Sequence, residues 1–566
     1  MNNQANVFGI RGDETDQQGK PLWDYFRHEV VDYSDKLLYG ANGPWPMPSP
    51  GRPLSEVAEV VNMPRAEMWD WYKNVALRYL KLIVTKTPEA LYWAYFKSGS
   101  RYRNYTDTAF QNLLNRRMYS KFFTPLDHGD KNLFAGEIAA EKLDPTTLLK
   151  MDFSGMEKMC NHCHEGVYTA ASIVLFTPDG RYDDGSAKFR AVAIHLYTTD
   201  AQGKKDQASA RTYTPNSKAP DQQKKWRLAK YFVLQGAVHR INMTEHGRLH
   251  FPLDAMNAIT KSILPTDHPL FVILKPHLRL TLAVDNSVLE GKNALISRTN
   301  WTIYSPFAAP GKIIRKLIPD GYVGRRDKPN AFPPYEFPFR VNDTPTSFNL
   351  FLSSYLPLFE KFYGEVLDIL LPDSYRVDEN ASDADKQARR CWEFIALWAE
   401  CTAEWVPGFL RRKALNLTPL NGLVTPDKAP LIATVANIIW NVTIAHAADH
   451  VEFGNNGPAR NVFRIRVKPP LGDTPVDYNF RKKMVNRFDL FQSYLAHELF
   501  YKPLNTVNLE DVRYPFNEIG VDAETQRILE MKHGAFLKAL QECDTQQMER
   551  DPLLCALEDV SSSIQY

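Results

Sequence analysis

Two pairs of histidines have the spacing of metal ligands. His246 and His250 are four residues apart in TEHGRLH, and His446 and His450 are four apart in TIAHAADH. Residues i and i+4 share one face of a helix, about 6 Å apart, so each pair can bind a common metal ion. Imidazole suits iron, zinc and copper, so these histidines leave the identity of the metal open.

The surroundings of the second pair decide how the pairs are interpreted. A single HxxxH pair is more often an accident of sequence, or a hydrogen-bonded core pair, than a metal site. Residues 431–448, LIATVANIIWNVTIAHAA, are apolar on every side and predict a helix through the core. Imidazoles at the end of such a helix need partners, because unpaired polar groups are costly there. The residues alone therefore predict a buried polyhistidine metal site.

A further histidine leaves one alternative open. His239 lies seven residues before His246, about 10 Å away along a helix axis, and could join the site only across a bend. The ligand pair on the first helix is thus His246 with His250 or, if an irregular turn intervenes, His239 with His246.

The elements that must position these histidines are mainly helical. ASIVLF and AVAIHLY, within residues 168–198, are rich in β-branched and aromatic residues and flank Asp-Gly turns, which predicts a β-hairpin. Helical periodicity dominates after Pro220, apart from a Pro-rich loop near 319–340. It also marks residues 64–96, where apolar residues recur every three or four positions: Trp69, Tyr72, Val75, Leu80, Ile83, Leu91 and Tyr95.

These patterns predict a mainly α protein with a small β element. Residues 1–60 are rich in proline, glycine and polar groups and are expected to form an extended arm. Residues 61–566 are expected to form one large helical domain.

Composition excludes several classes of protein. A net charge of +2 gives no field that argues for nucleic acid or an anionic membrane. Asn437, Asn441 and His446 interrupt the apolar run, so we expect no stable membrane insertion. No secretory signal opens the chain, and six sparse cysteines suit a reducing compartment, so a cytoplasmic protein is expected. We also expect it to be a monomer. Cys160 and Cys163 form a CxxC without the second ligand pair of a zinc knuckle.

Beyond the histidines, several segments resemble the lipoxygenase family from about residue 140 to the end. WRLAK (226–230) resembles the entry to the family's first metal-binding helix. HPLF (268–271), LKPHLR (274–279) and TL (281–282) together look like the family's HPL(F/Y)-x-LL-x-PH-x-R-x-TL segment, the most specific match. HAADH (446–450) with FG (453–454) resembles the second metal-binding helix, and VSSSIQY (560–566) is similar to the family's terminal V/I-P-N-S-I-S-I.

The resemblance implies a ligand set. In the family the C-terminal carboxylate binds iron, which implies His246, His250 and His446 as nitrogen ligands, His450 as a fourth or weak one, and the carboxylate of Tyr566 as the oxygen ligand. The family's last residue is usually Ile or Val, but only the main-chain carboxylate needs to bind. His268 and His277 belong to the matching segment and are expected to be buried structural residues. The cofactor implied is one non-heme iron, with manganese as a variant.

Three features depart from the family pattern. A gapless count places the family's first histidine on Ile241, so the His246–His250 pair requires a shift in register. LISRTNW (295–301) resembles the segment that steers O2, where the family's small Ala or Gly falls near Ser297 or Arg298. We also expect no counterpart of the N-terminal β-barrel of plant and animal members, because residues 1–60 are too short and too rich in proline.

The activity implied is a dioxygenase reaction on an unsaturated lipid. In the family, the metal centre takes a hydrogen atom from the methylene between two cis double bonds, and O2 captures the radical to give a hydroperoxide. Two alternatives remain. An arginine in the pocket would favour a smaller or non-lipid substrate, and a chain without bound metal would be a catalytically silent lipid-binding member.

Overall fold

The computed structural model describes residues 69–96, 105–216, 219–281, 306–317, 337–406, 408–455, 462–472, 475–477, 479–500 and 507–564. The arm expected over residues 1–60, the pocket positions Ser297 and Arg298, and the terminal Tyr566 lie outside these ranges. The question of an N-terminal β-barrel falls on the same undescribed N-terminal residues.

Two long helices pass through the core, and each contains one wide turn. The first consists of α8 (Pro220–Arg240), the π-helical turn η5 (Ile241–Glu245) and α9 (His246–Ile263). The second consists of α16 (Ala429–Trp440), the π-helical turn η10 (Asn441–Ala445) and α17 (His446–Asn455). Of the helices that the structure describes, one stretch, Ala429–Phe453, is long and apolar enough to cross a membrane. Its most apolar window is 89% buried inside the protein, as expected for a core helix.

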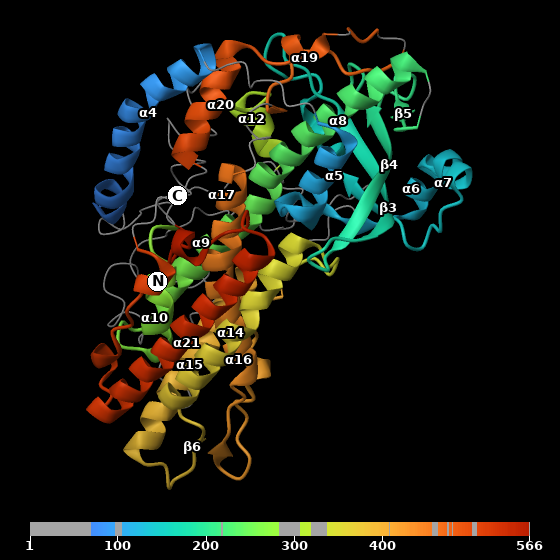
Figure 1. The fold of residues 1–566 in the computed structure, drawn as a ribbon. Helices are drawn as coiled ribbons and strands as arrows, with labels where there is room; N and C mark the ends of the chain where they lie inside the picture. The colour runs from blue at the N-terminus through green and yellow to red at the C-terminus, as the bar shows by residue number, and fades with distance from the viewer. Residues whose placement is uncertain are drawn as a thin grey trace.

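Three further long helices, α14 (Ser347–Leu370), α15 (Asp383–Trp405) and α21 (Ala523–Arg550), lie together in the lower half of Figure 1. Their first turns are capped by the side chains of Thr346, Ser382 and Asp522, which accept hydrogen bonds from backbone N–H groups that have no partner within the helix. The other helices of eight residues or more are α4 (Leu77–Tyr95), α5 (Asp107–Arg116) and α20 (Arg487–Phe500).

Short helices connect the long ones. The short α-helices are α6 (His128–Leu133), α7 (Ala135–Glu141), α10 (Pro269–Leu274), α12 (Gly311–Ile314) and α19 (Phe480–Lys483). A π-turn, η1 (Tyr72–Ala76), leads into α4, and the 3-10 turns are η3 (Met118–Phe122), η4 (Ser154–Met159), η6 (Lys275–His277), η8 (Arg315–Leu317), η9 (Arg412–Leu415), η11 (Leu509–Asp511), η12 (Phe516–Ile519) and η13 (Leu557–Asp559).

A five-stranded antiparallel sheet packs on one side of α8 and is visible at the right of Figure 1. Its strands lie in chain order: β1 (Thr124–Pro125), β2 (Leu149–Asp152), β3 (Ala171–Arg181), β4 (Ala187–Tyr197) and β5 (Arg211–Tyr213). Alternate residues of β3 point to opposite faces, so Val174 packs into the main core while Ile173 joins a smaller cluster with Phe134. A separate pair consists of β6 (Tyr375–Arg376) and β7 (Leu423–Val424).

The predicted hairpin is confirmed, and its two Asp-Gly pairs have different roles. β3 and β4 form the hairpin, and Gly185 supplies the turn with a φ of +78°. Gly180 also has a positive φ, but it lies at an irregularity within β3, where the pairing register shifts. The mainly helical class is confirmed as well, whereas the three other strands of the sheet carried no comparable sequence signal.

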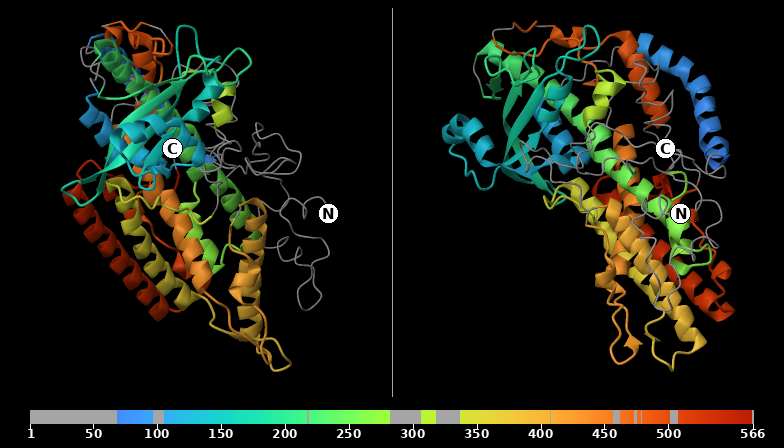
Figure 2. Two further views of the ribbon diagram at one scale, coloured as in Figure 1. Left: turned by 90° about the vertical axis from the view of Figure 1, so that its right-hand side faces the viewer. Right: turned by 180° about the vertical axis from the view of Figure 1, so that it is seen from behind.

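The helix predicted over residues 64–96 is present over its described part, but its apolar face points outward. The described part starts at Trp69, and residues 69–95 form one continuous helix. Val75 is buried, whereas Trp69 and Leu80 are 72% and 59% exposed. Figure 2 shows this helix at the edge of the molecule, next to α20.

Candidate metal centre

Both histidine pairs begin directly after a π-helical turn. Residues 241–245 form the turn before His246, and residues 441–445 form the turn before His446. A π-turn adds one residue to a helical turn and thereby rotates everything that follows. The side chain of Asn441 bonds across to the carbonyl oxygen of Leu249, 3.4 Å away, which ties the two helices together at this level.

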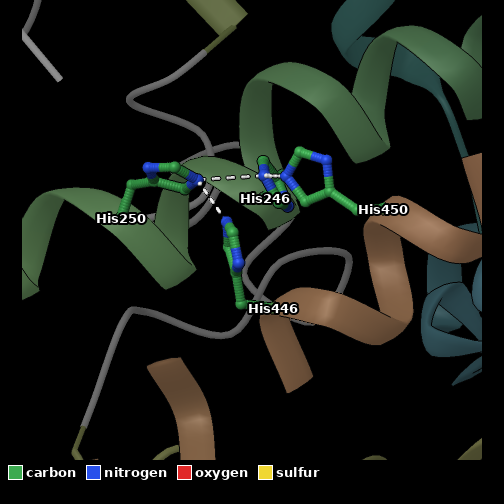
Figure 3. Close-up of side chains that lie close together, drawn as sticks. All are labelled: His246, His250, His446 and His450. Carbon is green, nitrogen blue, oxygen red and sulfur yellow. Dashed lines mark hydrogen bonds between the residues drawn. The ribbon is translucent and has the colours of Figure 1, made fainter. Parts of the chain in front are cut away.

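The four imidazoles converge from the two helices (Figure 3). The Nε2 atoms of His246 and His250 are 2.9 Å apart, those of His250 and His446 are 3.1 Å apart, and those of His246 and His450 are 3.0 Å apart. One ligand nitrogen from each of the four rings lies within 4.8 Å of all the others. His250, His446 and His450 are buried, and His246 is nearly so.

The spacing of these nitrogens fits a single bound ion. Two ligands about 2.1 Å from one ion and at right angles to each other are about 3 Å apart, which matches the neighbouring Nε2 atoms. Burial and the neighbouring rings hold the pKa of His246 and His446 well below the usual value for histidine. Both imidazoles are therefore neutral near pH 7, and each has a lone pair to offer a metal.

A buried ion pair lies beside the cluster, and the sequence did not reveal it. Asp449 is fully buried, with one carboxylate oxygen 2.5 Å from Nζ of Lys121 and the other 3.5 Å from Nδ1 of His246. Asp449 stands within the HAADH motif, but its partner is more than 300 residues away in the chain. Only the fold brings η3 against α17.

His239 lies outside the cluster, although an irregular turn does separate it from His246. Its Nδ1 donates to the carbonyl oxygen of Gln235 at 2.8 Å, and its Nε2 accepts from the backbone N–H of Ala308 at 3.2 Å. Both ring nitrogens are thus engaged, and burial lowers the pKa of His239 to about 4. The arrangement that pairs His239 with His246 is not the one that the structure adopts.

His268 and His277 are buried and hydrogen-bonded, as expected. His268 caps α10 by accepting the backbone N–H of Leu270 on Nδ1, and its Nε2 lies 3.2 Å from the carbonyl oxygen of Cys391. His277 donates from Nδ1 to the carbonyl oxygen of Ser562 at 2.7 Å, and its Nε2 lies 2.9 Å from the hydroxyl of Tyr514.

The bond from His277 is one of several that fix the C-terminal segment in the core. Residues 560–564 are all buried. The backbone N–H of Ser562 donates to Val507, and the hydroxyl of Ser563 donates to the carbonyl oxygen of Arg279, both at 2.9 Å. The segment therefore runs through the core up to Ile564, two residues before the chain ends.

The CxxC has the features of a structural element. Cys160 and Cys163 donate to the carbonyl oxygens of Met156 and Met159, and burial raises the pKa of both thiols to about 12. Such thiols are poor nucleophiles at neutral pH. All six cysteines are free, and the four histidines are the one group of possible metal ligands within the described ranges.

Comparisons with known proteins agree with this site. Residues 156–310 match the lipoxygenase family model, a stretch that includes His246 and His250. No curated protein sequence matches the chain.

Solved lipoxygenase structures share the fold along most of the chain. An engineered lipoxygenase variant aligns with a TM-score of 0.62 at 13% identity, covering 98% of this chain and 84% of that one. The manganese lipoxygenase of Gaeumannomyces graminis aligns with a TM-score of 0.59 at 13% identity, covering 88% and 92%. A 9R-lipoxygenase from Cyanothece aligns with a TM-score of 0.55 at 11% identity, covering 92% and 76%. The chain is thus a lipoxygenase-fold protein with a lipoxygenase-family segment, which confirms the resemblance drawn from its motifs.

The buried histidines outside the cluster predict a loss of stability in mild acid. Burial holds the pKa of His239, His268 and His277 at about 4, against about 6.5 in an unfolded chain. The unfolded state therefore binds more protons between these values, and stability falls as the pH drops from 6.5 towards 4. Each such histidine costs about 3 kcal/mol over that range.

The test is the pH dependence of the free energy of unfolding, measured with denaturant, in wild type and in His268→Asn. Asparagine keeps an oxygen that can cap α10 but binds no proton, so the slope should fall by up to about 1.4 kcal/mol per pH unit. His128→Asn, at an exposed position at the start of α6, is the matched control and should keep the wild-type slope. An unchanged slope in His268→Asn would contradict the assignment.

Proposed function

We propose that this protein is a non-heme iron dioxygenase that inserts O2 into a polyunsaturated fatty acid and releases a hydroperoxide. The observation that carries the proposal is the convergence of four buried imidazoles from two core helices, in a chain with the lipoxygenase fold. A lipoxygenase-family segment over residues 156–310 supports it.

The proposed ligands follow from the geometry and the resemblance together. His246, His250 and His446 would hold the iron, and His450 would be a fourth or weaker ligand. The main-chain carboxylate of Tyr566 would supply the oxygen. Two residues span at most about 7 Å, so the burial of Ile564 limits how far Tyr566 can lie from the core.

When bound, the metal would supply the one-electron chemistry that breaks a weak C–H bond of the substrate. The chain's own residues do the rest. Burial keeps His246 and His446 neutral, so they offer lone pairs rather than protons. Val442 and Ile444, just before His446, are 0% and 1% exposed, so this stretch of the helix lies in a dry, apolar part of the core. Exclusion of water protects a radical from side reactions.

Iron is proposed over manganese on the resemblance, although the same fold holds manganese in the Gaeumannomyces graminis lipoxygenase. The free cysteines suit the cytoplasmic location that we propose.

Alanine substitution of His446 should remove both the metal and the activity. The imidazole is fully buried, and its ring centroid lies 4.6 Å from that of His450 and 4.9 Å from that of His250, so its loss leaves a gap in the cluster. Metal per chain is measured by elemental analysis, which also distinguishes iron from manganese. Activity is measured as O2 uptake with linoleic acid and as absorbance from the conjugated diene.

His195→Ala, in β4 of the sheet, is the matched control and should keep full metal content. A His446→Ala protein with full metal occupancy would remove His446 from the ligand set. If metal-loaded wild type takes up no O2 with any of a panel of polyunsaturated acids and esters, a smaller or non-lipid substrate becomes the leading hypothesis. Wild type without bound metal would indicate a silent lipid-binding member.

The C-terminal carboxylate is tested by changing where the chain ends. Tyr566→Ile keeps the carboxylate in place and should keep the metal and much of the activity. Deletion of Tyr566 shifts the carboxylate by about 3.5 Å, farther than a metal–oxygen bond of about 2 Å can tolerate. A C-terminal tag replaces the carboxylate by an amide, a weaker neutral ligand. Normal iron content and turnover in the tagged protein would show that Tyr566 is not a ligand.

A further inference from the structure

The exposed large apolar side chains of the described residues are concentrated on one helix. Nine of the fifteen lie between residues 69 and 96, although these residues are a small part of the chain. We call them the outer stripe: Trp69, Tyr72, Leu77, Leu80, Val84, Leu91, Tyr92, Tyr95 and Phe96. Within α4, Leu77, Leu80, Val84 and Leu91 follow one another at intervals of three, four and seven residues, which places them on one side of the helix. A contiguous apolar surface of this kind marks an interaction site.

The opposite side of this helix is fixed to the body of the protein. Ala90 and Ala94 are fully buried, and their small side chains let α4 approach α20 closely. The hydroxyl of Tyr494 donates to Glu89 at 2.6 Å. At the other end, Arg279 forms two hydrogen bonds with Asp70, at 2.6 and 2.7 Å. The helix is held on one side, and it presents the outer stripe on the other.

The chemistry of the outer stripe indicates what it binds. Five of its nine members are aromatic, and Trp and Tyr favour the boundary between lipid tails and headgroups. Lys73 and Lys81 are exposed among them, and Arg487 at the start of α20 lies over the ring of Tyr95, 5.5 Å from its centre. The two acidic residues of this helix are ion-paired, Asp70 with Arg279 and Glu89 with Lys86. The face is therefore apolar with a positive charge, as in helices that lie on anionic membranes.

We propose that η1 and α4 dock the protein on the surface of an anionic lipid bilayer, with the outer stripe at the level of the headgroups. The helix lies flat on the membrane and does not cross it. This inference does not depend on a metal or on catalysis. If the proposed lipid oxygenation also holds, docking here would bring the protein to the membrane that contains its substrate.

The test is binding to phosphatidylcholine vesicles with and without phosphatidylserine, measured by co-sedimentation. Wild type should bind the vesicles that contain phosphatidylserine. The variant Leu77→Ser, Leu80→Ser, Val84→Ser should bind at least tenfold more weakly. Lys73→Gln with Lys81→Gln should weaken binding to anionic vesicles by about 30-fold, at roughly fivefold per lysine, and reduce its salt dependence. Leu420→Ser, 76% exposed and far along the chain, is the control and should bind as wild type does.

Three outcomes would overturn the proposal. The proposal is wrong if wild type binds neither kind of vesicle. It is also wrong if the stripe variants bind as wild type does. A stripe variant whose mass in solution falls from dimer to monomer would assign the stripe to a second copy of the chain.

A second inference concerns the ion pair beside the cluster, and it rests on the proposed metal centre. The Nε2 of His246 faces the other imidazoles, so its Nδ1 points outward to Asp449, 3.5 Å away. A carboxylate in this place fixes the imidazole tautomer, with the proton on Nδ1 and the lone pair on Nε2. It also makes the imidazole a stronger electron donor. Lys121 reduces this effect because its ammonium group, 2.5 Å from the same carboxylate, neutralises part of the charge.

We infer that Asp449 and Lys121 are positioning residues that set the electron donation of His246 to the metal. They act in opposite directions. Asp449→Asn should raise the midpoint potential of the bound iron and weaken metal binding by about 10- to 100-fold. Lys121→Met leaves the carboxylate uncompensated and should lower the potential. Lys121→Arg keeps the charge and should restore the wild-type value.

The measurement is a spectroscopic redox titration together with metal content per chain. If Lys121 acts through Asp449, Lys121→Met should have little effect in the Asp449→Asn background. An equal effect in both backgrounds would mean that the lysine acts on the metal directly, and the inference that it acts through Asp449 would be wrong. Equal potentials in wild type and both single variants would also refute the inferred influence of Asp449 and Lys121 on His246. The proposed metal centre would not be affected by that result. Wild type without any bound metal would instead refute the proposed metal centre.

Discussion

Four imidazoles meet in the core with neighbouring Nε2 atoms about 3 Å apart, and such a close approach disfavours positive charge on the rings. Protonated rings whose nitrogens lie about 3 Å apart would repel strongly, and burial penalises each charge further. The lowered pKa of His246 and His446 expresses this penalty. A neutral imidazole offers a lone pair, and a cation is the natural partner for lone pairs that converge on one point. The rest of the structure serves to hold these rings in place.

Two long helices hold the rings in place, and the π-turn in each helix sets the direction in which its histidines point. A regular helix would continue past residue 241 or residue 441 with the orientation of its preceding turn. The extra residue in η5 and in η10 turns the following segment so that its histidines face the other helix. Each π-turn directly precedes the first histidine of its pair, so both helices orient their histidines in the same way. The bond from Asn441 to Leu249 joins the wide turn η10 to α9, within the segment that carries His246 and His250.

The C-terminal segment is held by a separate network whose members are far apart in the chain. His277 bonds to the carbonyl oxygen of Ser562, while Tyr514 and Tyr363 complete the network with hydroxyls 2.8 Å apart. His277 stays neutral because it is buried, and its Nδ1 can donate while its Nε2 interacts with Tyr514. A loose tail would contribute nothing to the core, whereas residues 560–564 are buried and hydrogen-bonded to His277, Arg279 and Val507. The place of residues 560–564 in the core is therefore a property of the fold.

The sequence by itself determined the helical class, the β-hairpin and three of the four clustered histidines, His246, His446 and His450. These depend on local periodicity and on residue type, which can be read along the chain. Tertiary structure decided the rest. Apolar periodicity at Trp69, Tyr72 and Leu80 indicates a helix but cannot say whether its apolar side meets the core or the solvent. The choice between His239 and His250 depended on one extra residue in a helical turn, and a helical pattern does not record such a turn. The pairing of Lys121 with Asp449 joins residues more than 300 positions apart, so only the packing of η3 against α17 could bring them together.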